Sequence, residues 1–311
     1  MNATTELVRP CYSISIRERA AALYKISAEL LLATLPDSHV DLVVTSPPYC
    51  MGKEYEKSTS ATDFLENHRR IFPEVFRVLK PGGSLCWQVG HHVTNGVAVP
   101  LDALVYLAAM DFPGLILRNR IVWTFGHGTH SPRRFSGRHE NLLWFTKGDK
   151  YTFDLDAVRV PQRYPGKRHY KGKDKGKLSG NPLGKNPGDV WDMPNVKARH
   201  IEKTAHPCQF PVALPRRLVR ALTKPNDLVL DPYLGSGSSA VAALLEGRNF
   251  IGCDIKQSYL NIAKNRLKSL ESGSLEVRTD EPPAEPNRSQ SVAKLPSAWH
   301  SLRKKIHAPD V

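Results

Sequence analysis

Two short segments of the sequence combine residue types that could bind and orient a planar amine beside a nucleoside. The first is Thr45-Ser46-Pro47-Pro48-Tyr49. Two consecutive prolines hold the backbone rigid, and both the Pro47 carbonyl and the Ser46 hydroxyl can accept hydrogen bonds. Tyr49 adds a flat aromatic face. Two acceptors beside an aromatic ring suit the exocyclic amino group of a stacked base, although a strand that ends in a simple proline turn gives the same pattern.

The second segment is the glycine-rich stretch Asp231-Pro-Tyr-Leu-Gly-Ser-Gly-Ser238. Gly235 and Gly237 permit backbone angles and a close approach that a Cβ would prevent. Asp254 follows at the end of the next expected strand, where a carboxylate can accept hydrogen bonds from two ribose hydroxyls. The spacing indicates a nucleoside-cofactor site. It lacks the Gly-Lys-Ser/Thr of a phosphate-binding loop and the third glycine of G-x-G-x-x-G.

The elements that must position these segments alternate between strands and helices. Short apolar runs at residues 40–44 and 227–231 fit buried parallel strands, and each ends at one of the two segments. Further strands are expected over 84–90, 120–125, 141–146 and 249–254, and helices over 18–32, 61–79, 100–110, 212–222, 238–246 and 257–270. The alternation predicts an α/β fold with a parallel sheet. Ligands bind beyond the carboxyl ends of such strands, so both segments should face one crevice.

The charge of the chain indicates a polyanionic partner. Its 311 residues include 44 Lys and Arg against 30 Asp and Glu, a formal net charge of +14. Neutralising phosphates releases counterions and drives association, so we expect nucleic acid, rather than solubility alone, to explain the basic surface.

The remaining composition narrows the class of protein. Hydrophobic residues make up 41% of the chain, and no apolar run approaches the roughly 18 residues of a spanning helix, which argues against a membrane protein and against a wholly disordered one. The N-terminus lacks the order of a signal peptide, and five scattered cysteines without a C-x-x-C pair suit a reducing cytoplasm. The histidines lack zinc-site spacing, so no metal is expected.

Taken together, the two segments resemble the motifs of the DNA amino-methyltransferases of restriction–modification systems, which depend on S-adenosylmethionine. The family's catalytic motif is D/N/S-P-P-Y/F, and its cofactor motif resembles D-P-F-x-G-S-G. The catalytic motif comes first in this chain, an order similar to that of the family's β group. The resemblance covers about residues 38–270 and includes VFRVLKPGGSL (75–85), RNRIVW (118–123), RHENLLWFTK (138–147), GDVWDMP (188–194) and EKTAHPCQFP (202–211).

The resemblance implies a Rossmann-like methyltransferase sheet in the strand order 3-2-1-4-5-7-6, with strand 7 antiparallel, and a basic target-recognition insertion. On this basis, four regions are expected. They are the catalytic half of the methyltransferase domain (1–148), the target-recognition region (149–200), the cofactor-binding half (201–271) and a flexible tail (272–311) in which 297–306 could form a basic helix.

The resemblance also implies how the first segment acts. The family flips its target base out of the duplex, because the amino group is otherwise paired and stacked. Tyr49 would stack on the flipped base, while Ser46 and the Pro47 carbonyl accept the amino protons and Pro48 keeps the motif rigid. Cys50 would be a bystander. Holding those protons out of the ring plane turns the nitrogen lone pair toward the methyl sulfonium, so neither a metal nor a covalent intermediate is needed.

Two further sets of residues follow from the resemblance. S-adenosylmethionine would contact Asp231, Tyr233, Leu234, Gly235, Ser236, Gly237, Asp254, Ile255, Phe210 and Pro211. In that set Asp254 would hold the ribose, Ile255 would pack on adenine, and Phe210 with Pro211 would form the opposite wall or simply anchor a loop. Double-stranded DNA would contact Arg133, Arg134, Arg163, Lys167, Arg168, Lys171 and Lys173.

The target base and some partners stay open. Thr-Ser-Pro-Pro-Tyr is typical of the family's N4-cytosine enzymes, whereas Asp or Asn at the serine position marks most N6-adenine enzymes, so cytosine is favoured and adenine is the alternative. An RNA amino-methyltransferase and an inactive DNA-binding protein are further hypotheses. We expect a cytoplasmic protein at the bacterial nucleoid, either monomer or homodimer, that protects DNA from a cognate restriction endonuclease where one exists.

Overall fold

The computed structural model describes residues 9–49, 60–94, 96–126, 128, 130–197, 200–278, 294, 296 and 299. The chain divides into two compact units, one of Met1–Phe153 with Asp189–Thr279 and one of Asp154–Gly188 with Asp280–Val311. Cys50 and most of the expected tail, with the possible basic helix over 297–306, lie outside the described residues apart from Trp299.

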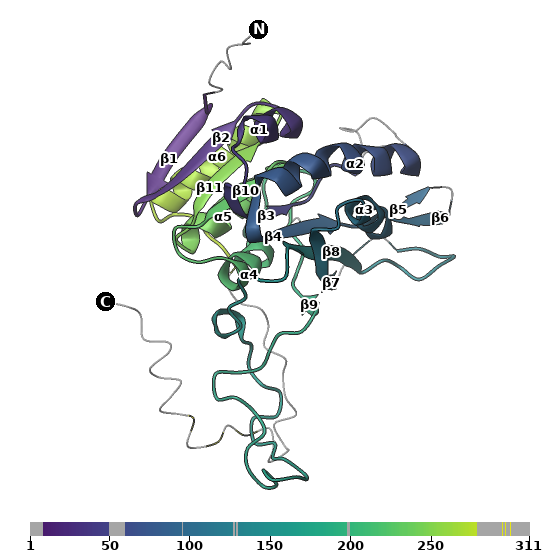
Figure 1. Ribbon diagram of the computed structural model, residues 1–311, viewed down its shortest axis with the longest axis vertical. Coiled ribbons are helices and arrows are strands. Elements are labelled where there is room, and N and C mark those ends of the chain that lie inside the picture. Colours follow the sequence, from purple (N-terminus) through teal and green to yellow (C-terminus); the bar gives the residue numbers. More distant parts are fainter. Residues whose placement is uncertain are drawn as a thin grey trace. The chain divides into compact units, whose positions relative to one another are not determined.

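A nine-stranded mixed sheet forms the centre of the first unit (Figure 1). Its strands are β1 (Tyr12–Ile16), β2 (Arg19–Tyr24), β3 (Val40–Thr45), β4 (Leu79–Val89), β7 (Leu115–Thr124), β8 (His139–Lys147), β9 (Val190–Asp192), β10 (Leu228–Asp231) and β11 (Asn249–Cys253). They lie in the order β1-β2-β11-β10-β3-β4-β8-β7-β9. The run from β2 to β7 has the seven-strand order implied by the family resemblance, with β8 antiparallel to both of its neighbours. That prediction is confirmed, and β1 and β9 are additions at the two edges.

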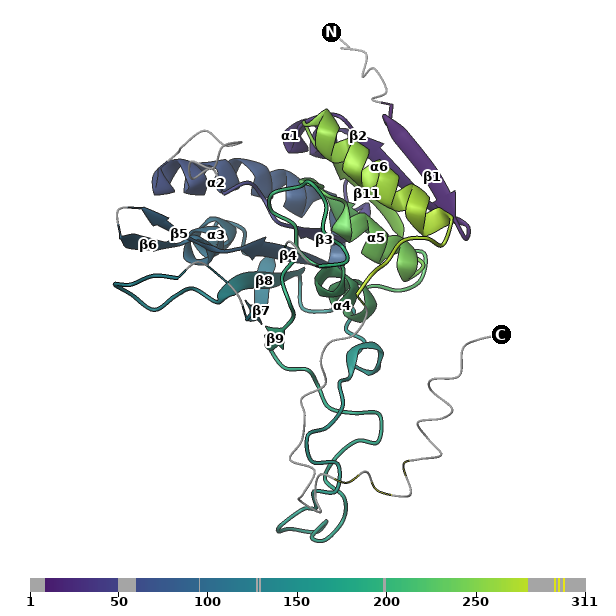
Figure 2. The ribbon, with the colours of Figure 1, turned by 180° about the vertical axis from the view of Figure 1, so that it is seen from behind.

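Two groups of helices cover this sheet (Figures 1 and 2). One group is α1 (Ala28–Thr34), α2 (Ala61–Val78) and α3 (Leu101–Met110), and the other is α4 (Ala213–Leu222), α5 (Ser238–Leu245) and α6 (Gln257–Glu271). A small hairpin, β5 (His91–Thr94) with β6 (Val97–Pro100), follows β4. Among the described residues, no helix is long and apolar enough to cross a membrane.

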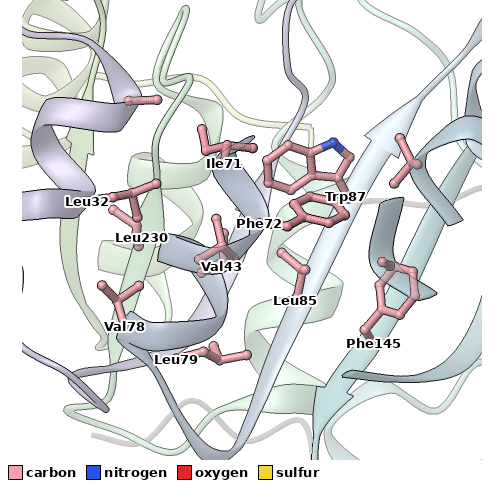
Figure 3. Packing of buried hydrophobic residues seen from close by; sticks show 14 of the residues in the cluster. Leu32, Val43, Ile71, Phe72, Val78, Leu79, Leu85, Trp87, Phe145 and Leu230 are labelled. Atoms are coloured by element: carbon pink, nitrogen blue, oxygen red, sulfur yellow. The ribbon is translucent and has the colours of Figure 1, made fainter. Parts of the chain in front are cut away.

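The core beneath the first helix group fixes the strands that lead to the predicted site. Trp87 of β4 packs edge-on against Phe72 of α2 (Figure 3), and its indole N–H donates to His68 Nε2 over 3.0 Å. Burial lowers the pKa of His68 to about 4, so this imidazole stays neutral and can accept that bond. Val43 and Leu85 lie in the same cluster, which holds β3 and β4 at fixed heights in the sheet.

The helix predicted over residues 18–32 is wrong. That stretch forms β2 and, after Ser27 as N-cap, the short helix α1. The tight turn between β1 and β2 consists of Arg17 and Glu18, both with positive φ, so it lacks the Asn-Gly or Asp-Gly sequence that signals such hairpins. Alanines in β2 favour a helix locally, but parallel pairing with β11 overrides this propensity. The N-terminal segment therefore supplies a strand of the central sheet.

The second unit has little regular structure in its described part. It contains a 3₁₀ turn at Asp156–Val158. Two isolated antiparallel bridges, Val160 with Lys185 and Arg168 with Leu178, pair earlier residues of the unit with later ones. Backbone hydrogen bonds such as His169 N–H to the Lys177 carbonyl close the turns between them. The described part of this unit is therefore held together by turns and local hydrogen bonds.

Candidate functional site

The two predicted segments leave the carboxyl ends of neighbouring parallel strands, β3 and β10. We call residues 46–49 the proline loop and residues 232–237 the glycine loop. The Thr45 hydroxyl donates to Asp231 Oδ1 over 2.5 Å, so the last residue of β3 is bonded directly to the last residue of β10. Both segments therefore start at the same end of the sheet, where the expected crevice would lie.

Asp231 is the hub of this junction. Its side chain is fully buried, and it accepts from the Ser239 hydroxyl at 2.5 Å and from the Tyr233 N–H at 3.0 Å as well as from Thr45. Burial raises the pKa of Asp231 to about 6, against the opposing effect of these donors. The carboxylate thus joins β3, the glycine loop and the first turn of α5, and its oxygens face protein rather than solvent.

The glycine loop has room only for glycine at its second bend. Gly237 has a φ of +76°, and a Cβ there would lie 2.8 Å from the Ala263 Cβ of α6. Gly235 is also left-handed, and its N–H donates to Asp254 Oδ2 over 3.1 Å. The loop is therefore pressed against α6 and tied to the end of β11, as the predicted cofactor spacing requires.

Asp254 and Ile255 lie beside this loop. Both Asp254 oxygens accept backbone N–H groups, one from Gly235 and one from Lys256 at 2.8 Å. Burial raises the pKa of Asp254, although its side chain is only partly covered. The Ile255 side chain is 67% exposed. A partly open carboxylate next to an uncovered aliphatic side chain can hold a polar sugar and an apolar ring side by side.

The segment around Phe210 and Pro211 packs against the same loop. The Ser238 hydroxyl donates to the Phe210 carbonyl over 2.9 Å. Upstream, buried Glu202 accepts the Val212 N–H over 2.8 Å and lies 3.7 Å from the guanidinium of Arg266. The structure therefore brings the segment 202–211 to the glycine loop.

Arg266 is a residue that the sequence reasoning missed. From α6 it donates to the Ser236 carbonyl at 2.9 Å and to the Ser238 hydroxyl at 3.0 Å, holding both ends of the second glycine bend. Burial lowers its pKa to about 10, and the nearby Glu202 opposes that shift. Sequence gives no signal for this contact except an arginine on the buried stripe of a helix.

His206 was also missed as a neighbour of the glycine loop. Its ring packs on Tyr259, with 4.2 Å between ring centroids, and a Cβ on Gly235 would lie 3.0 Å from its Nε2. Its Nδ1 accepts the Cys208 N–H. Within the described residues, no three His, Cys, Asp or Glu side chains come together to hold a metal ion.

A polar network holds the aromatic ring of the proline loop. Gln88 Nε2 donates to the Tyr49 hydroxyl over 3.2 Å, and the Tyr49 hydroxyl in turn donates to Glu140 Oε2 over 3.3 Å. Gln88 also donates to Glu140. Burial raises the pKa of Tyr49 well above its ordinary value, and the Glu140 charge adds to this, whereas a hydrogen bond with Ser46 opposes it. Tyr49 therefore stays protonated, with its ring edge fixed.

Sequence reasoning missed Gln88 and Glu140, although each is a polar residue in an otherwise apolar strand. Pro47 is buried, Ser46 is half-buried and Pro48 is exposed. Of the two prolines, Pro47 is therefore covered by protein and Pro48 is open to solvent, whereas Ser46 keeps partial access to solvent. The network therefore fixes the Tyr49 ring beside the Ser46 hydroxyl, with which Tyr49 forms a hydrogen bond.

The predicted DNA contacts fall in both units. Arg133 and Arg134 are exposed on the connection between β7 and β8 of the first unit. The other five are exposed in the second unit: Arg163, Lys167, Arg168, Lys171 and Lys173. Of these, Arg168 donates to the Gly176 carbonyl over 2.6 Å, and Arg163 lies over the ring of Tyr164. The exposed cations of the second unit thus cluster along one pair of turns.

Comparison with known proteins places this geometry in a family. The type II methyltransferase M.BglII of Bacillus subtilis is 47% identical over 234 residues, a match that covers 75% of this chain and 65% of that protein. The solved PvuII DNA methyltransferase (cytosine-N4-specific) matches with a TM-score of 0.66 at 21% identity, over 87% of this chain and 96% of that chain. A Thermus thermophilus protein described as a DNA modification methylase, solved with S-adenosyl-L-methionine, matches with a TM-score of 0.57 at 27% identity, over 81% and 96%.

The extent of these matches agrees with the fold. A family model described as DNA methylase matches residues 40–265, from the start of β3 into α6. This range contains the proline loop, the glycine loop and the strands between them, whereas β1 and β2 precede it. The chain belongs to the N6/N4 DNA methylase family.

Proposed function

We propose that this chain transfers a methyl group from S-adenosylmethionine to the exocyclic N4 of a flipped cytosine in double-stranded DNA. The observation that carries the proposal is the hydrogen bond from Thr45 to Asp231. It joins the loop that would hold the amino group to the loop that would hold the methyl donor. The match to a Thermus thermophilus methylase solved with S-adenosylmethionine supports the choice of cofactor.

The glycine loop and its surroundings fit this cofactor. Its backbone makes two left-handed bends, at Gly235 and Gly237, which lead the chain from the end of β10 into α5. Asp254 would hold the ribose hydroxyls, and exposed Ile255 would cover one face of the adenine. Tyr233, Leu234 and Ser236 complete the loop, with Phe210 and Pro211 on the other side. When bound, S-adenosylmethionine supplies an electrophilic methyl group on a sulfonium.

Asp231 supports the cofactor indirectly in this proposal. Its carboxylate is fully buried and accepts three donors from the protein, which fixes the shape of the glycine loop. Removing it should therefore abolish cofactor binding through loss of loop geometry as well as through any direct contact.

The proline loop would orient the amino group. The Ser46 hydroxyl and the Pro47 carbonyl accept the two amino protons, and the Tyr49 ring stacks on the base. Gln88 and Glu140 fix the Tyr49 hydroxyl, which sets the plane of that ring. With the amino protons held out of the ring plane, the nitrogen lone pair is released from conjugation. Positioning of this kind can lower a barrier by several kcal/mol.

Cytosine is favoured over adenine by the residue at position 46. Serine offers a neutral acceptor where most N6-adenine members carry Asp or Asn, and cytosine is the smaller base. N6-adenine is the alternative for the same fold and cofactor.

The exposed cations would bind the duplex. Those of the second unit, together with Arg133 and Arg134, would neutralise phosphates, and some arginines would read guanine edges. The similarity to M.BglII supports a restriction–modification role, with the protein acting on DNA in the bacterial cytoplasm and protecting it from a cognate endonuclease.

Expression in a methylation-deficient bacterial host tests the proposal. Genomic DNA would be digested to nucleosides and analysed by mass spectrometry, and sequencing of the same DNA would give the site. N4-methylcytosine is expected, and it should disappear with Ser46→Ala. N6-methyladenine would overturn the choice of base alone. If neither appears while the purified protein binds S-adenosylmethionine, RNA is the next substrate to test; DNA binding without cofactor binding would indicate an inactive protein.

A further inference from the structure

The connection between β7 and β8 carries an aromatic side chain that is fully exposed to solvent. Phe135 is 100% exposed, although a phenyl ring is among the most favourable side chains to bury. Single exposed apolar residues are common, so the surroundings of Phe135 decide its meaning. Both preceding residues, Arg133 and Arg134, are exposed cations. An uncovered ring beside cations suits a partner that offers both an apolar stack and phosphates.

The loop that presents this ring is closed locally. The Ser131 N–H donates to the Ser136 hydroxyl over 3.1 Å, which draws the two ends of residues 131–136 together. Arg134 Nη1 donates to the Phe135 carbonyl over 3.2 Å, and Pro132 restricts the ascending arm. We call residues 131–136 the Phe135 loop. The connection that contains it extends beyond the sheet, beside the β5–β6 hairpin (Figures 1 and 2).

The base of the Phe135 loop is fixed to the predicted catalytic site. Phe125 N–H donates to the Arg138 carbonyl over 3.0 Å, and Gly137 packs so closely on His91 that a Cβ would lie 2.6 Å from its Cε1. Glu140, which accepts from Tyr49, follows at once in β8. The chain from Phe135 to Glu140 spans at most about 18 Å even when extended. This span is about half a turn of B-DNA, so one duplex can contact Phe135 and the site beside Glu140 at the same time.

We propose that Phe135 is a wedge that enters the base stack beside the target site and fills the space left by the flipped base. This inference rests on the proposed function, because it requires a duplex substrate whose base must leave the helix. Proteins that unstack DNA insert apolar side chains between base steps, and Phe is one of them. Arg133 and Arg134 would hold the flanking phosphates while the ring enters. Phe135 thus lowers the cost of opening the duplex and takes no part in the transfer.

The test compares Phe135→Ala with wild type on two duplexes that carry the sequenced recognition site. In one duplex the target base is paired normally, and in the other it faces a mismatch that already weakens pairing. Phe135→Ala should slow methylation of the paired duplex about tenfold to a hundredfold, the range that loss of one stacking contact gives. On the mismatched duplex its rate should return to within a few-fold of wild type. Phe135→Trp should keep most activity on both.

Arg133→Ala serves as the matched control. It removes a phosphate contact next to the ring, so it should weaken binding to both duplexes equally and reduce the dependence of affinity on salt. Because Phe135 is fully exposed, the melting temperature and the affinity for S-adenosylmethionine of Phe135→Ala should equal those of wild type.

Four results would overturn the wedge. Equal losses on the paired and mismatched duplexes would make Phe135 an ordinary contact, and unchanged rates on both would remove it from the reaction. A change of sedimentation coefficient with Phe135→Ala, at unchanged methylation, would assign the ring to contact between copies of the chain. If wild type itself fails to methylate either duplex, the proposed function is overturned, and the wedge with it.

Discussion

The proline loop and the glycine loop leave adjacent strands, yet they are held in different ways. Three buried groups hold the glycine loop and the start of α5. Asp231, at the end of β10, accepts from the Ser239 hydroxyl, and Arg266 of α6 donates to the Ser236 carbonyl. The Ser238 hydroxyl donates to the Phe210 carbonyl. The proline loop has its own stiff backbone, and a network of buried Gln88 and half-buried Glu140 holds its ring. This difference suggests that one loop must keep a fixed shape to bind, whereas the other must stay accessible to a large substrate.

Asp231→Ala tests the glycine loop most severely. The change leaves the Thr45 and Ser239 hydroxyls and the Tyr233 N–H without an acceptor in a buried place. At about 1–3 kcal/mol for each lost partner, we expect about 4 kcal/mol less stability and no measurable binding of S-adenosylmethionine by calorimetry. Asp149→Ala is the control, because that side chain is 87% exposed and its ion pair contributes little. Cofactor affinity that survives Asp231→Ala would disprove the role as a hub.

Arg266→Met comes next in size. It leaves the Glu202 carboxylate buried beside an apolar chain and releases the Ser236 carbonyl, so stability to urea should fall by about 3 kcal/mol. Adding Glu202→Gln should recover part of that loss, because the unpaired charge is gone. Lys268→Met on the exposed side of the same helix should change little. A double variant no better than the single one would contradict the buried pair.

Substitutions in the proline loop should affect turnover instead. Tyr49→Ala and Ser46→Ala are each expected to lower kcat about a hundredfold, the size of one lost orienting contact, while affinity for S-adenosylmethionine changes less than about threefold. Tyr49→Phe keeps the ring and loses the hydrogen bonds of its hydroxyl, among them those to Gln88, Glu140 and Ser46, so its loss should be about tenfold or less. Methylation assays with radiolabelled cofactor would measure these rates. Equal effects on affinity and turnover would erase the contrast between the loops.

The smallest effect concerns pH. Burial raises the pKa of Asp231 from 3.8 to about 6, so the folded state holds this proton more tightly than the unfolded state. Its contribution to stability is therefore present below about pH 4 and is lost as pH rises toward about 6, by roughly 1 kcal/mol for each pH unit. Asp231→Asn lacks this titration. The difference in unfolding free energy between wild type and Asp231→Asn should fall between about pH 4 and 6 and stay level above about 7; a flat difference would contradict the shift.

The sequence predicted the two loops because each stands at the end of a short apolar strand and carries residues with few structural alternatives. It predicted the helices from α2 onward for a similar reason, since their apolar stripes are regular. The partners of the loops were not predictable in this way. Glu202 with Arg266, and Gln88 with Glu140, are pairs brought together by the fold from distant segments. For Gln88 and Glu140, the only local signal was a lone polar residue in an otherwise apolar strand.

The N-terminal hairpin was not predicted because both residues of its turn, Arg17 and Glu18, have a left-handed backbone conformation, which these residue types rarely adopt. Its alanines also favour a helix, and only contact with β11 selects the strand. The family match begins at residue 40, so the resemblance implied seven strands in the sheet but did not locate one of them at residues 19–24.

The pairing of β2 with β11 also governs when the protein can mature during translation. Residues 19–24 leave the ribosome before their parallel neighbour, residues 249–253, which is made only after all the residues between them. At about 5–20 residues per second, the first strand waits roughly 10–50 s for its partner. Nascent chains that have not yet reached β11 therefore carry an open sheet edge, and the central sheet cannot be completed before residues 249–253 have been synthesised.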